Sequence, residues 1–199
     1  MKTSYLYIFI TAALATLSAC SNDLEKVIWV SDDTDSDLPA YTEWGYNSFG
    51  AYVNNRAFTS NRYSEIPTMC FVTSAEHLTF CMENSNHHDF SPDIVKLSFR
   101  FPYKRINSYV GLSDLHGMTI DLASDDVIVS VLPNNDTNSE DTLKIARGTL
   151  TFSRVQMLHI DDNLVEAIVS GTFDFDGSSN SASYEVRKGR FDFGAMATT

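Results

Sequence analysis

The alternation of apolar and polar residues is the clearest pattern along the chain. Between Leu164 and Phe175 nearly every second side chain is apolar, and polar or acidic side chains occupy most of the positions between them. A strand with this period of two places one face on a core and the other in water. Short runs of β-branched and aromatic residues, separated by Asn, Asp, Gly and Ser, continue from Tyr41 onward and show no helical period. The pattern predicts a chain built of strands.

The runs predict strands at Ser48 to Val53, Thr68 to Thr73, Leu78 to Met82, Ile94 to Phe101, Met118 to Leu122, Val127 to Leu132, Leu143 to Phe152, Val155 to Ile160, Leu164 to Phe175 and Ser183 to Phe193. Many short strands at close spacing are typical of a sandwich or a barrel. We therefore predict an all-β fold, an antiparallel β-sandwich or a flattened β-barrel of about ten strands.

The connection before the strand that starts at Leu164 has the composition of a hairpin loop. Asp161 to Asn163 suits a three-residue loop, because Asn tolerates the left-handed conformation that such a loop needs at its last position. This loop would set Met157 opposite Ala167 and His159 opposite Val165, on one face of the hairpin.

The alternation slips inside the last predicted strand. Tyr184 and Val186 occupy even positions, whereas Phe191 and Phe193 occupy odd ones, with Lys188-Gly189 between the two pairs. A β-bulge at the glycine would return both pairs to the same face and would bend the strand, as a barrel or a tightly curved sandwich requires.

The first residues have the order of parts of a secretion signal. Lys2 is a positive start, Tyr5 to Leu17 is apolar, and the small residues Ser18 and Ala19 follow. The run Leu17-Ser18-Ala19-Cys20 resembles the lipobox of bacterial lipoproteins, in which the residues before the cysteine are removed and the cysteine is acylated. That resemblance implies a signal peptide over residues 1–19 and a lipid anchor on Cys20. Two or more acyl chains hold a protein stably on a membrane.

The segment after Cys20 is strongly acidic. Residues 21–38 hold six acidic residues and the single base Lys26, and Pro39 follows. The composition predicts a lipidated acidic tether over residues 20–39 and a β domain over residues 40–199. The apolar run Val27 to Val30 leaves an alternative open, in which this part docks on the domain as an edge strand.

The overall charge excludes one class of partner. The chain has 14 basic and 26 acidic residues, so removal of the segment with Lys2 leaves 13 minus 26, a formal charge of −13. Nucleic acids and anionic lipid surfaces recruit clusters of Lys and Arg. We therefore expect no binding to nucleic acid.

The segment Asn47-Ser48-Phe49-Gly50-Ala51-Tyr52-Val53-Asn54, with Gly171-Thr-Phe-Asp-Phe175 and Gly189-Arg-Phe-Asp-Phe193, resembles an uncharacterised family of Bacteroidetes surface lipoproteins. The family has a lipobox and an acidic spacer before a similar segment, with a glycine where this chain has Asn55. Ser21-Asn22-Asp23 also resembles the export signal that places such lipoproteins on the outer face of the outer membrane. The resemblance implies an outer-membrane location facing the exterior, and it implies no catalytic residue.

The other two cysteines are spaced as a facing pair. If residues 74–77 form a four-residue hairpin loop closed by Thr73 and Leu78, Cys70 and Cys81 lie directly opposite each other. At a non-hydrogen-bonded position the Cα atoms approach to roughly 4.5 Å, which a disulfide accepts. The spacing predicts a Cys70–Cys81 disulfide in an oxidising compartment, with two buried free thiols as the alternative.

The sequence holds none of the common catalytic or phosphate-binding motifs, such as Gly-x-Ser-x-Gly, His-Glu-x-x-His or Cys-x-x-Cys. We predict no catalytic residue, no metal site and no cofactor. The strongest candidate for binding is a cluster of aromatic residues, Tyr41, Trp44, Tyr46, Phe49, Tyr52, Phe58 and Tyr63. Trp44 and Tyr46 flank Gly45 in a predicted loop, where exposed aromatic rings can stack on sugar rings. The alternative is that the cluster fills the core.

Together these features predict a lipid-anchored protein that binds an extracellular glycan or protein without catalysis. A structural or assembly component of the envelope is one alternative, and a barrel that carries a small apolar ligand is another.

Overall fold

The computed structural model describes residues 26–64, 68–84, 93–134, 139–161 and 163–196. Within these residues a 10-stranded antiparallel sheet curls into a half-barrel, and a separate two-stranded sheet lies near the start of the chain. The predicted all-β class is therefore confirmed.

The strands are β1 (Ser31–Asp32), β2 (Asp35–Pro39), β3 (Ser48–Val53), β4 (Arg56–Thr59), β5 (Met69–Thr73), β6 (His77–Glu83), β7 (Ile94–Pro102), β8 (Thr119–Asp121), β9 (Ile128–Pro133), β10 (Asp141–Ile160), β11 (Asn163–Ser178) and β12 (Ser183–Met196). Their order across the large sheet is β4-β3-β12-β11-β10-β9-β7-β6-β5, and β8 also pairs with β10.

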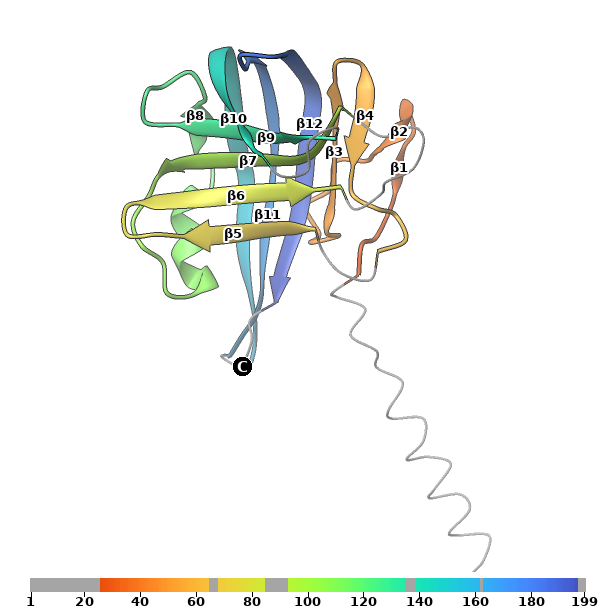
Figure 1. Ribbon diagram of the computed structural model, residues 1–199. Coiled ribbons are helices and arrows are strands. Elements are labelled where there is room, and N and C mark those ends of the chain that lie inside the picture. Colours follow the sequence, from red (N-terminus) through yellow and green to blue (C-terminus); the bar gives the residue numbers. More distant parts are fainter. Residues whose placement is uncertain (1–25, 65–67, 85–92, 135–138, 162, 197–199) are drawn as a thin grey trace, which may run out of the picture.

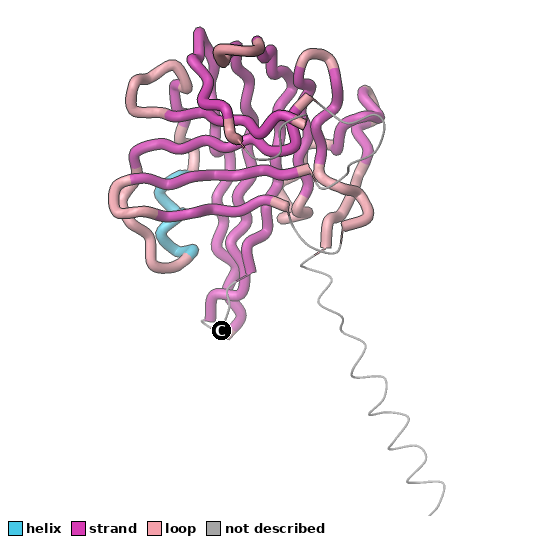
Figure 2. The backbone as a smooth tube through the Cα atoms, viewed as in Figure 1, coloured by secondary structure: helices cyan, strands magenta, loops and turns pink. Residues whose placement is uncertain are grey.

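The long strand β10 joins the two halves of the curled sheet. Its first residues, Asp141 to Leu143, pair with β9, and from Lys144 onward the strand pairs with β11. Figure 1 shows the consequence, since β5, β6 and β7 run across the long strands β10, β11 and β12. Figure 2 shows that strands make up nearly all of both layers and that the helical segment is short.

Phenylalanine side chains from both halves fill the space between the layers. Ring centroids lie 4.7 Å apart between Phe80 and Phe191 and 5.4 Å apart between Phe99 and Phe173. These four side chains are at most 2% exposed. Because side chains alternate along each strand, the residues between them point to the outer surface of the sheet.

The strand β10 is continuous where we predicted two strands. The register with β11 shifts between Phe152 and Arg154, which marks a bulge at Ser153. Phe152 is fully buried, and Val155 packs against the same core three residues later. The extra residue lets both side chains face inward, so the break in alternation signals a bulge rather than a strand end.

Four short elements were not predicted from the sequence: β1, β2, β4 and a 3-10 helix. The strand β4 is only four residues long and follows the tight turn at Asn54 and Asn55, which both have positive φ. The 3-10 helix spans Tyr109–Leu115 and buries Leu112 and Leu115. These elements are too short to show a period.

The hairpin between β10 and β11 differs in part from the prediction. Met157 lies opposite Ala167 as expected, but His159 pairs with Leu164 because the register shifts between Leu158 and His159. The left-handed residue is Asp161, with φ 50°.

The predicted bulge in β12 is confirmed at Lys188, which has φ 55°. The register with β3 shifts between Arg187 and Arg190. As a result, Tyr184 and Phe193 are both at most 5% exposed, although one stands at an even position and the other at an odd one.

The described part of the predicted tether, residues 26–39, lies on the domain. Val27 to Val30 do not form the edge strand of the alternative, because the strands of this segment are β1 and β2 and they pair with each other. Leu38 is fully buried. On the polar side, Lys188 donates to Asp35 at 2.8 Å and Arg190 contacts Asp32 at 2.5 Å. These contacts tie residues 32–38 to the sheet.

Candidate functional site

The outer surface of β10, β11 and β12 carries rows of polar side chains that face away from the core. Cross-strand pairing places them in rows, because outward positions repeat every second residue. We call this surface the outer strip and define it by the rows Arg154, Ser170 and Asp192; Thr151, Thr172 and Arg190; Thr149 and Asp174; and Arg147, Asp176 and Glu185. From Ser170 to Asp176 the strip extends about 20 Å along β11.

The loop at residues 41–46 covers one end of the outer strip, and the buried carboxylate of Asp192 holds it there. Asp192 accepts hydrogen bonds from the hydroxyls of Thr42 at 2.5 Å and Ser170 at 2.8 Å. It also accepts the backbone N–H groups of residues 44–46 at 3.1, 2.8 and 3.2 Å. A carboxylate that gathers several donors in this way fixes their positions.

Glycine is required where this loop meets the sheet. Gly45 has φ 77°, and a Cβ atom there would lie 2.8 Å from Oε1 of Glu166 and 3.3 Å from Cα of Gly194. A larger residue would push the loop off the sheet and break its contacts with Asp192. The local sequence Trp-Gly-Tyr therefore sets the height of the loop above the strands.

The loop presents one aromatic side chain almost entirely to solvent. Trp44 is 72% exposed and Tyr41 is 38% exposed. Tyr46 is only half-buried, with its carbonyl accepting the N–H of Ile28 at 2.8 Å. Of the two predicted ligand-binding residues, Trp44 is thus the accessible one, whereas Tyr41 was overlooked. Tyr41 could have been found from the sequence, because it belongs to the same aromatic cluster as Trp44.

The remaining members of the aromatic cluster divide between core and surface. Phe49 and Phe58 are fully buried, with ring centroids 5.0 Å apart, whereas Tyr63 is 84% exposed. The Tyr52 hydroxyl donates to Asp35 at 2.6 Å, and this bond raises the pKa of Tyr52 to about 12. The interpretation of the cluster as core is therefore correct for the phenylalanines only.

A polar network stands beside the exposed rings. The Tyr41 hydroxyl donates to Glu43 at 2.9 Å, and Arg154 contacts the other oxygen of Glu43 at 3.3 Å. Arg154 also donates to the side chain of Gln156. Each of these side chains can give up a hydrogen bond inside the network and form one with a hydroxyl or amide group of a ligand instead.

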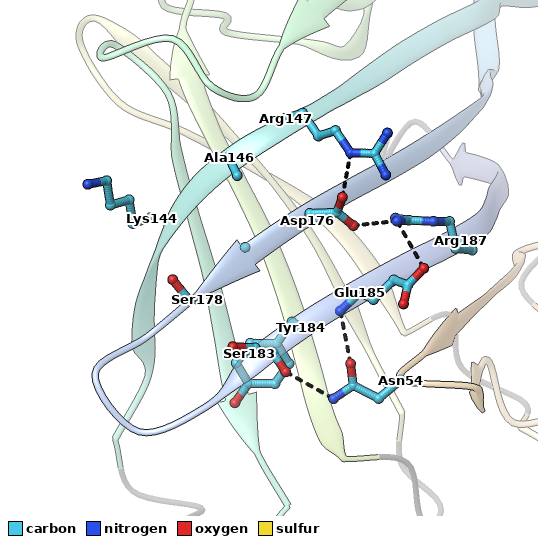
Figure 3. A pocket seen from close by; sticks show the side chains of 11 residues that line it. Asn54, Lys144, Ala146, Arg147, Asp176, Ser178, Ser183, Tyr184, Glu185 and Arg187 are labelled. Atoms are coloured by element: carbon cyan, nitrogen blue, oxygen red, sulfur yellow. Dashed lines mark hydrogen bonds and ion pairs between the residues drawn. The ribbon is translucent and has the colours of Figure 1, made fainter.

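Two open pockets continue the outer strip away from Trp44. One, of about 430 Å³, is lined by Tyr41, Thr172, Phe173, Asp174, Lys188, Gly189 and Arg190. The other, of about 650 Å³, lies at the far end between β10, β11 and β12 and includes Tyr184 and Ser183 (Figure 3).

Charged side chains form a network of ion pairs in the larger pocket. Asp176 accepts from Arg147 and Arg187 on the two neighbouring strands, and Arg187 also contacts Glu185 at 3.0 Å (Figure 3). The two guanidinium groups, Arg147 foremost, lower the pKa of Asp176, so it is ionised at neutral pH. Asn54 donates to the Ser183 carbonyl at 3.1 Å and closes one side.

Glu166 lies under the loop and is 4% exposed. Burial raises the pKa of this carboxyl, and the negative charge of Asp192 adds to the shift. The folded protein therefore favours the neutral form of Glu166 more than water does.

The strip presents guanidinium groups, carboxylates and hydroxyls, and aromatic side chains stand at one end of it. Within the strip Arg147 pairs with Asp176, whereas Arg154 and Arg190 pair with Glu43 and Asp32 beside it. The described residues include no set of three or more His, Cys, Asp or Glu placed to hold a metal ion. Aromatic faces, hydroxyls and fork-shaped guanidinium groups are suited to binding sugars or peptides.

Cys70 and Cys81 lie outside this site, on β5 and β6, and pair directly with each other as the sequence predicted. Both are free thiols, and Ser98 donates to the Cys81 sulfur at 3.6 Å. The Cys70 thiol, as hydrogen-bond donor, is the main cause that lowers the pKa of Cys81 to about 6. The disulfide remains a prediction that this arrangement permits.

Cys20 and the predicted signal peptide lie outside the described residues. Within the described part of the chain, no helix is both long enough and apolar enough to cross a membrane.

Comparison with family models, with curated proteins and with solved structures finds no match to this chain. The interpretation of the site therefore depends on its own geometry.

Proposed function

We propose that this protein is a lipid-anchored surface protein that binds an extracellular glycan, without catalysis, along the outer strip. Cys20 would carry the lipid on the outer membrane, facing the exterior, and the β domain would present the binding surface. The observation that carries the proposal is Trp44, 72% exposed on a loop that a buried carboxylate clamps to the sheet.

The clamp favours binding because the backbone that carries the ring is held in place before any ligand arrives. An exposed Trp normally loses conformational freedom when it binds, which weakens affinity. Here the backbone N–H groups on both sides of the ring are already bonded to Asp192. The neighbouring Tyr41 and the polar side chains of Glu43 and Arg154 supply a second ring and hydrogen-bonding groups for sugar hydroxyls.

The test uses the chain from residue 21 onward, without the predicted signal peptide and the lipidated cysteine, on a printed array of glycans. Against the glycan that binds best, Trp44→Ala should weaken binding by about 2 kcal/mol, or roughly thirtyfold, as truncation of a central Trp typically does. The melting temperature should stay unchanged, because the side chain is mostly in solvent.

The matched control is Tyr63→Ala, which removes an aromatic side chain that is 84% exposed and does not line the strip. Its affinity should equal that of the parent protein. Equal affinity of Trp44→Ala and the parent, or no bound glycan on the array, would overturn the proposal and leave a protein partner or an assembly role.

The alternative of a carrier for a small apolar ligand receives no support from the interior. The Phe80, Phe152 and Phe191 rings pack against one another there, with centroids 4.7 to 6.2 Å apart. The two pockets described above open on the outer surface and are lined by charged side chains.

A further inference from the structure

Most of the exposed large apolar side chains in the described part of the chain belong to three segments near its start. Eight are exposed among the described residues, and five of them are Ile28, Val30, Tyr41, Trp44 and Tyr63. Scattered exposed apolar residues are ordinary, but a group of them marks a surface that contacts something other than water.

Backbone hydrogen bonds tie the segments that carry these side chains together. The Val27 N–H donates to the Ser64 carbonyl at 3.2 Å, and the Ile28 N–H donates to the Tyr46 carbonyl at 2.8 Å. The guanidinium group of Arg62 lies 4.6 Å from the centre of the Trp29 ring. Residues 27–30 thus connect the Tyr63 segment with the loop of the outer strip.

Within this group, the side chains divide between two surfaces. Tyr41 lines a pocket of the outer strip, and Trp44 stands on the loop that covers the strip. Ile28, Val30 and Tyr63 belong to the segments nearest the start of the described chain. We call these three residues the anchor patch.

The predicted lipid is attached only a short way from the anchor patch. Six residues, 20–25, separate Cys20 from Lys26. Fully extended, they span at most about 20 Å, whereas a globular domain of this size is about 40 Å across. A tether shorter than the domain holds the side from which it leaves close to the membrane.

The three side chains of the anchor patch are uncharged, and each of its two segments has one basic residue, Lys26 or Arg62. Acidic residues flank these segments in the sequence, at Glu25, Asp32 and Glu65. Contact with a bilayer would therefore depend on the apolar side chains and the short tether rather than on attraction between charges. Aromatic and aliphatic side chains next to basic ones are typical of proteins that rest at the lipid interface.

We propose that the anchor patch rests on the bilayer to which Cys20 is attached, and so orients the outer strip. This inference depends on the lipid anchor of the proposed function. The lipid keeps the patch at a high effective concentration near the membrane, so a contact that is weak by itself becomes populated. The domain is then held in one orientation instead of rotating freely on its tether.

The experiment uses the lipidated protein in vesicles of phosphatidylethanolamine and phosphatidylglycerol that contain brominated phosphatidylcholine, which quenches nearby tryptophan. The chain has two tryptophans, so Trp44→Phe leaves Trp29, between Ile28 and Val30, as the reporter. We expect quenching of Trp29 fluorescence in this variant. Adding Ile28→Ser, Val30→Ser and Tyr63→Ser should abolish most of it.

The matched control replaces Val72, Val110 and Ile128, the other three exposed apolar residues, by serine and should leave the quenching unchanged. If the triple variant of the patch does not fold, Val30→Ser alone should still reduce quenching. No quenching of Trp29, or equal quenching with and without the patch, would overturn the inference.

The outcome is separable from that of the proposed function. If mass spectrometry of the protein found no lipid on Cys20, the lipid anchor would be wrong, and the further inference would fail with it. Loss of glycan binding in Trp44→Ala with intact quenching of Trp29 would support both proposals, and intact glycan binding in Trp44→Ala would contradict only the glycan site.

Discussion

The carboxylate of Asp192 holds the loop with Trp44 on the sheet through hydrogen bonds. It is 1% exposed and accepts hydrogen bonds from three backbone N–H groups and two hydroxyls. Asp192→Asn replaces one acceptor oxygen by an NH₂ group, so buried donors lose their acceptor. We expect the free energy of unfolding, measured in urea, to fall by about 3 kcal/mol.

The matched control for this prediction is Asp174→Asn, an exposed aspartate on the neighbouring strand β11. Its effect should stay within about 0.5 kcal/mol, as is usual for surface substitutions. If both variants changed the stability equally, the hydrogen bonds to Asp192 would not be what holds the loop.

Glu166 gives the domain a stability that depends on pH. Its pKa is raised in the folded protein by burial and by the charge of Asp192. The group therefore contributes stability that is fully present below the pKa of the unfolded chain, near 4.5, and that is lost as the pH rises through the folded pKa. Glu166→Gln stays neutral, so its melting temperature should exceed that of the parent at pH 8 and match it at pH 4.

Thermal unfolding of the parent and of Glu166→Gln at several pH values between these limits tests the prediction. The difference in melting temperature should grow as the pH increases. A constant difference, or one that shrinks toward pH 8, would show that ionisation of Glu166 does not strain the fold.

Neither acid could be assigned from the sequence. Asp192 and Glu166 stand at outward positions of strands with regular alternation, where an acid is expected to be solvated. Their burial arises because the loop at residues 41–46, more than 100 positions away in the chain, folds over them. By contrast, Trp44 beside Gly45 was a visible signal, since a Trp in a turn has little core to enter.

At the scale of elements, the pairing of β5 with β6 makes the cysteines a testable pair. Cys70 and Cys81 face each other across the hairpin, and the lowered pKa of Cys81 favours its reactive thiolate. We expect the protein purified from cell envelopes without reductant to contain this disulfide. After unfolding, thiol titration should find no free thiol on either residue until reductant is added.

Two reactive thiols in the unreduced protein would refute the disulfide. Cys70→Ser is the matched variant, because it leaves Cys81 without its partner and should expose one titratable thiol. The substitution leaves Cys81 and the pairing of β5 with β6 unchanged, so the hairpin should still form.

The strands were largely predictable because local alternation determines them. In β11 the period of two continues over most of the strand, and the structure places Val169 and Phe173 in the core as expected. Local composition misled in the acidic segment, however. Asp32 and Asp35 were interpreted as solvated spacer residues, but their partners are Arg190 and Lys188, at the opposite end of the chain.

At the scale of the whole molecule, the outer strip and the anchor patch meet at the loop of residues 41–46. The loop is tied to the patch through the bond between Ile28 and Tyr46, and to the strip through Asp192. With the patch on the bilayer, the strip would extend along β11 away from the membrane. The far pocket around Asp176 and Tyr184 would then be the part most accessible to a ligand outside the cell.

Removal of the lipid should release the whole protein from the membrane. The three side chains of the anchor patch contribute on the order of 1 kcal/mol each on burial in the interface, and about 3 kcal/mol corresponds to a dissociation constant above about 1 mM. The net charge of −12 gives no compensating attraction to anionic lipids. A variant in which a secretion signal that is cleaved without lipidation replaces residues 1–20 should therefore move from the membrane fraction to the soluble fraction, as measured by detergent partition and by immunoblotting of fractionated cells. Val72→Ser, a substitution of an exposed apolar residue outside the patch, should leave the lipidated protein in the membrane fraction. Membrane association of the variant without Cys20 equal to that of the parent would mean that contacts of the folded domain, rather than acyl chains, hold the protein in place.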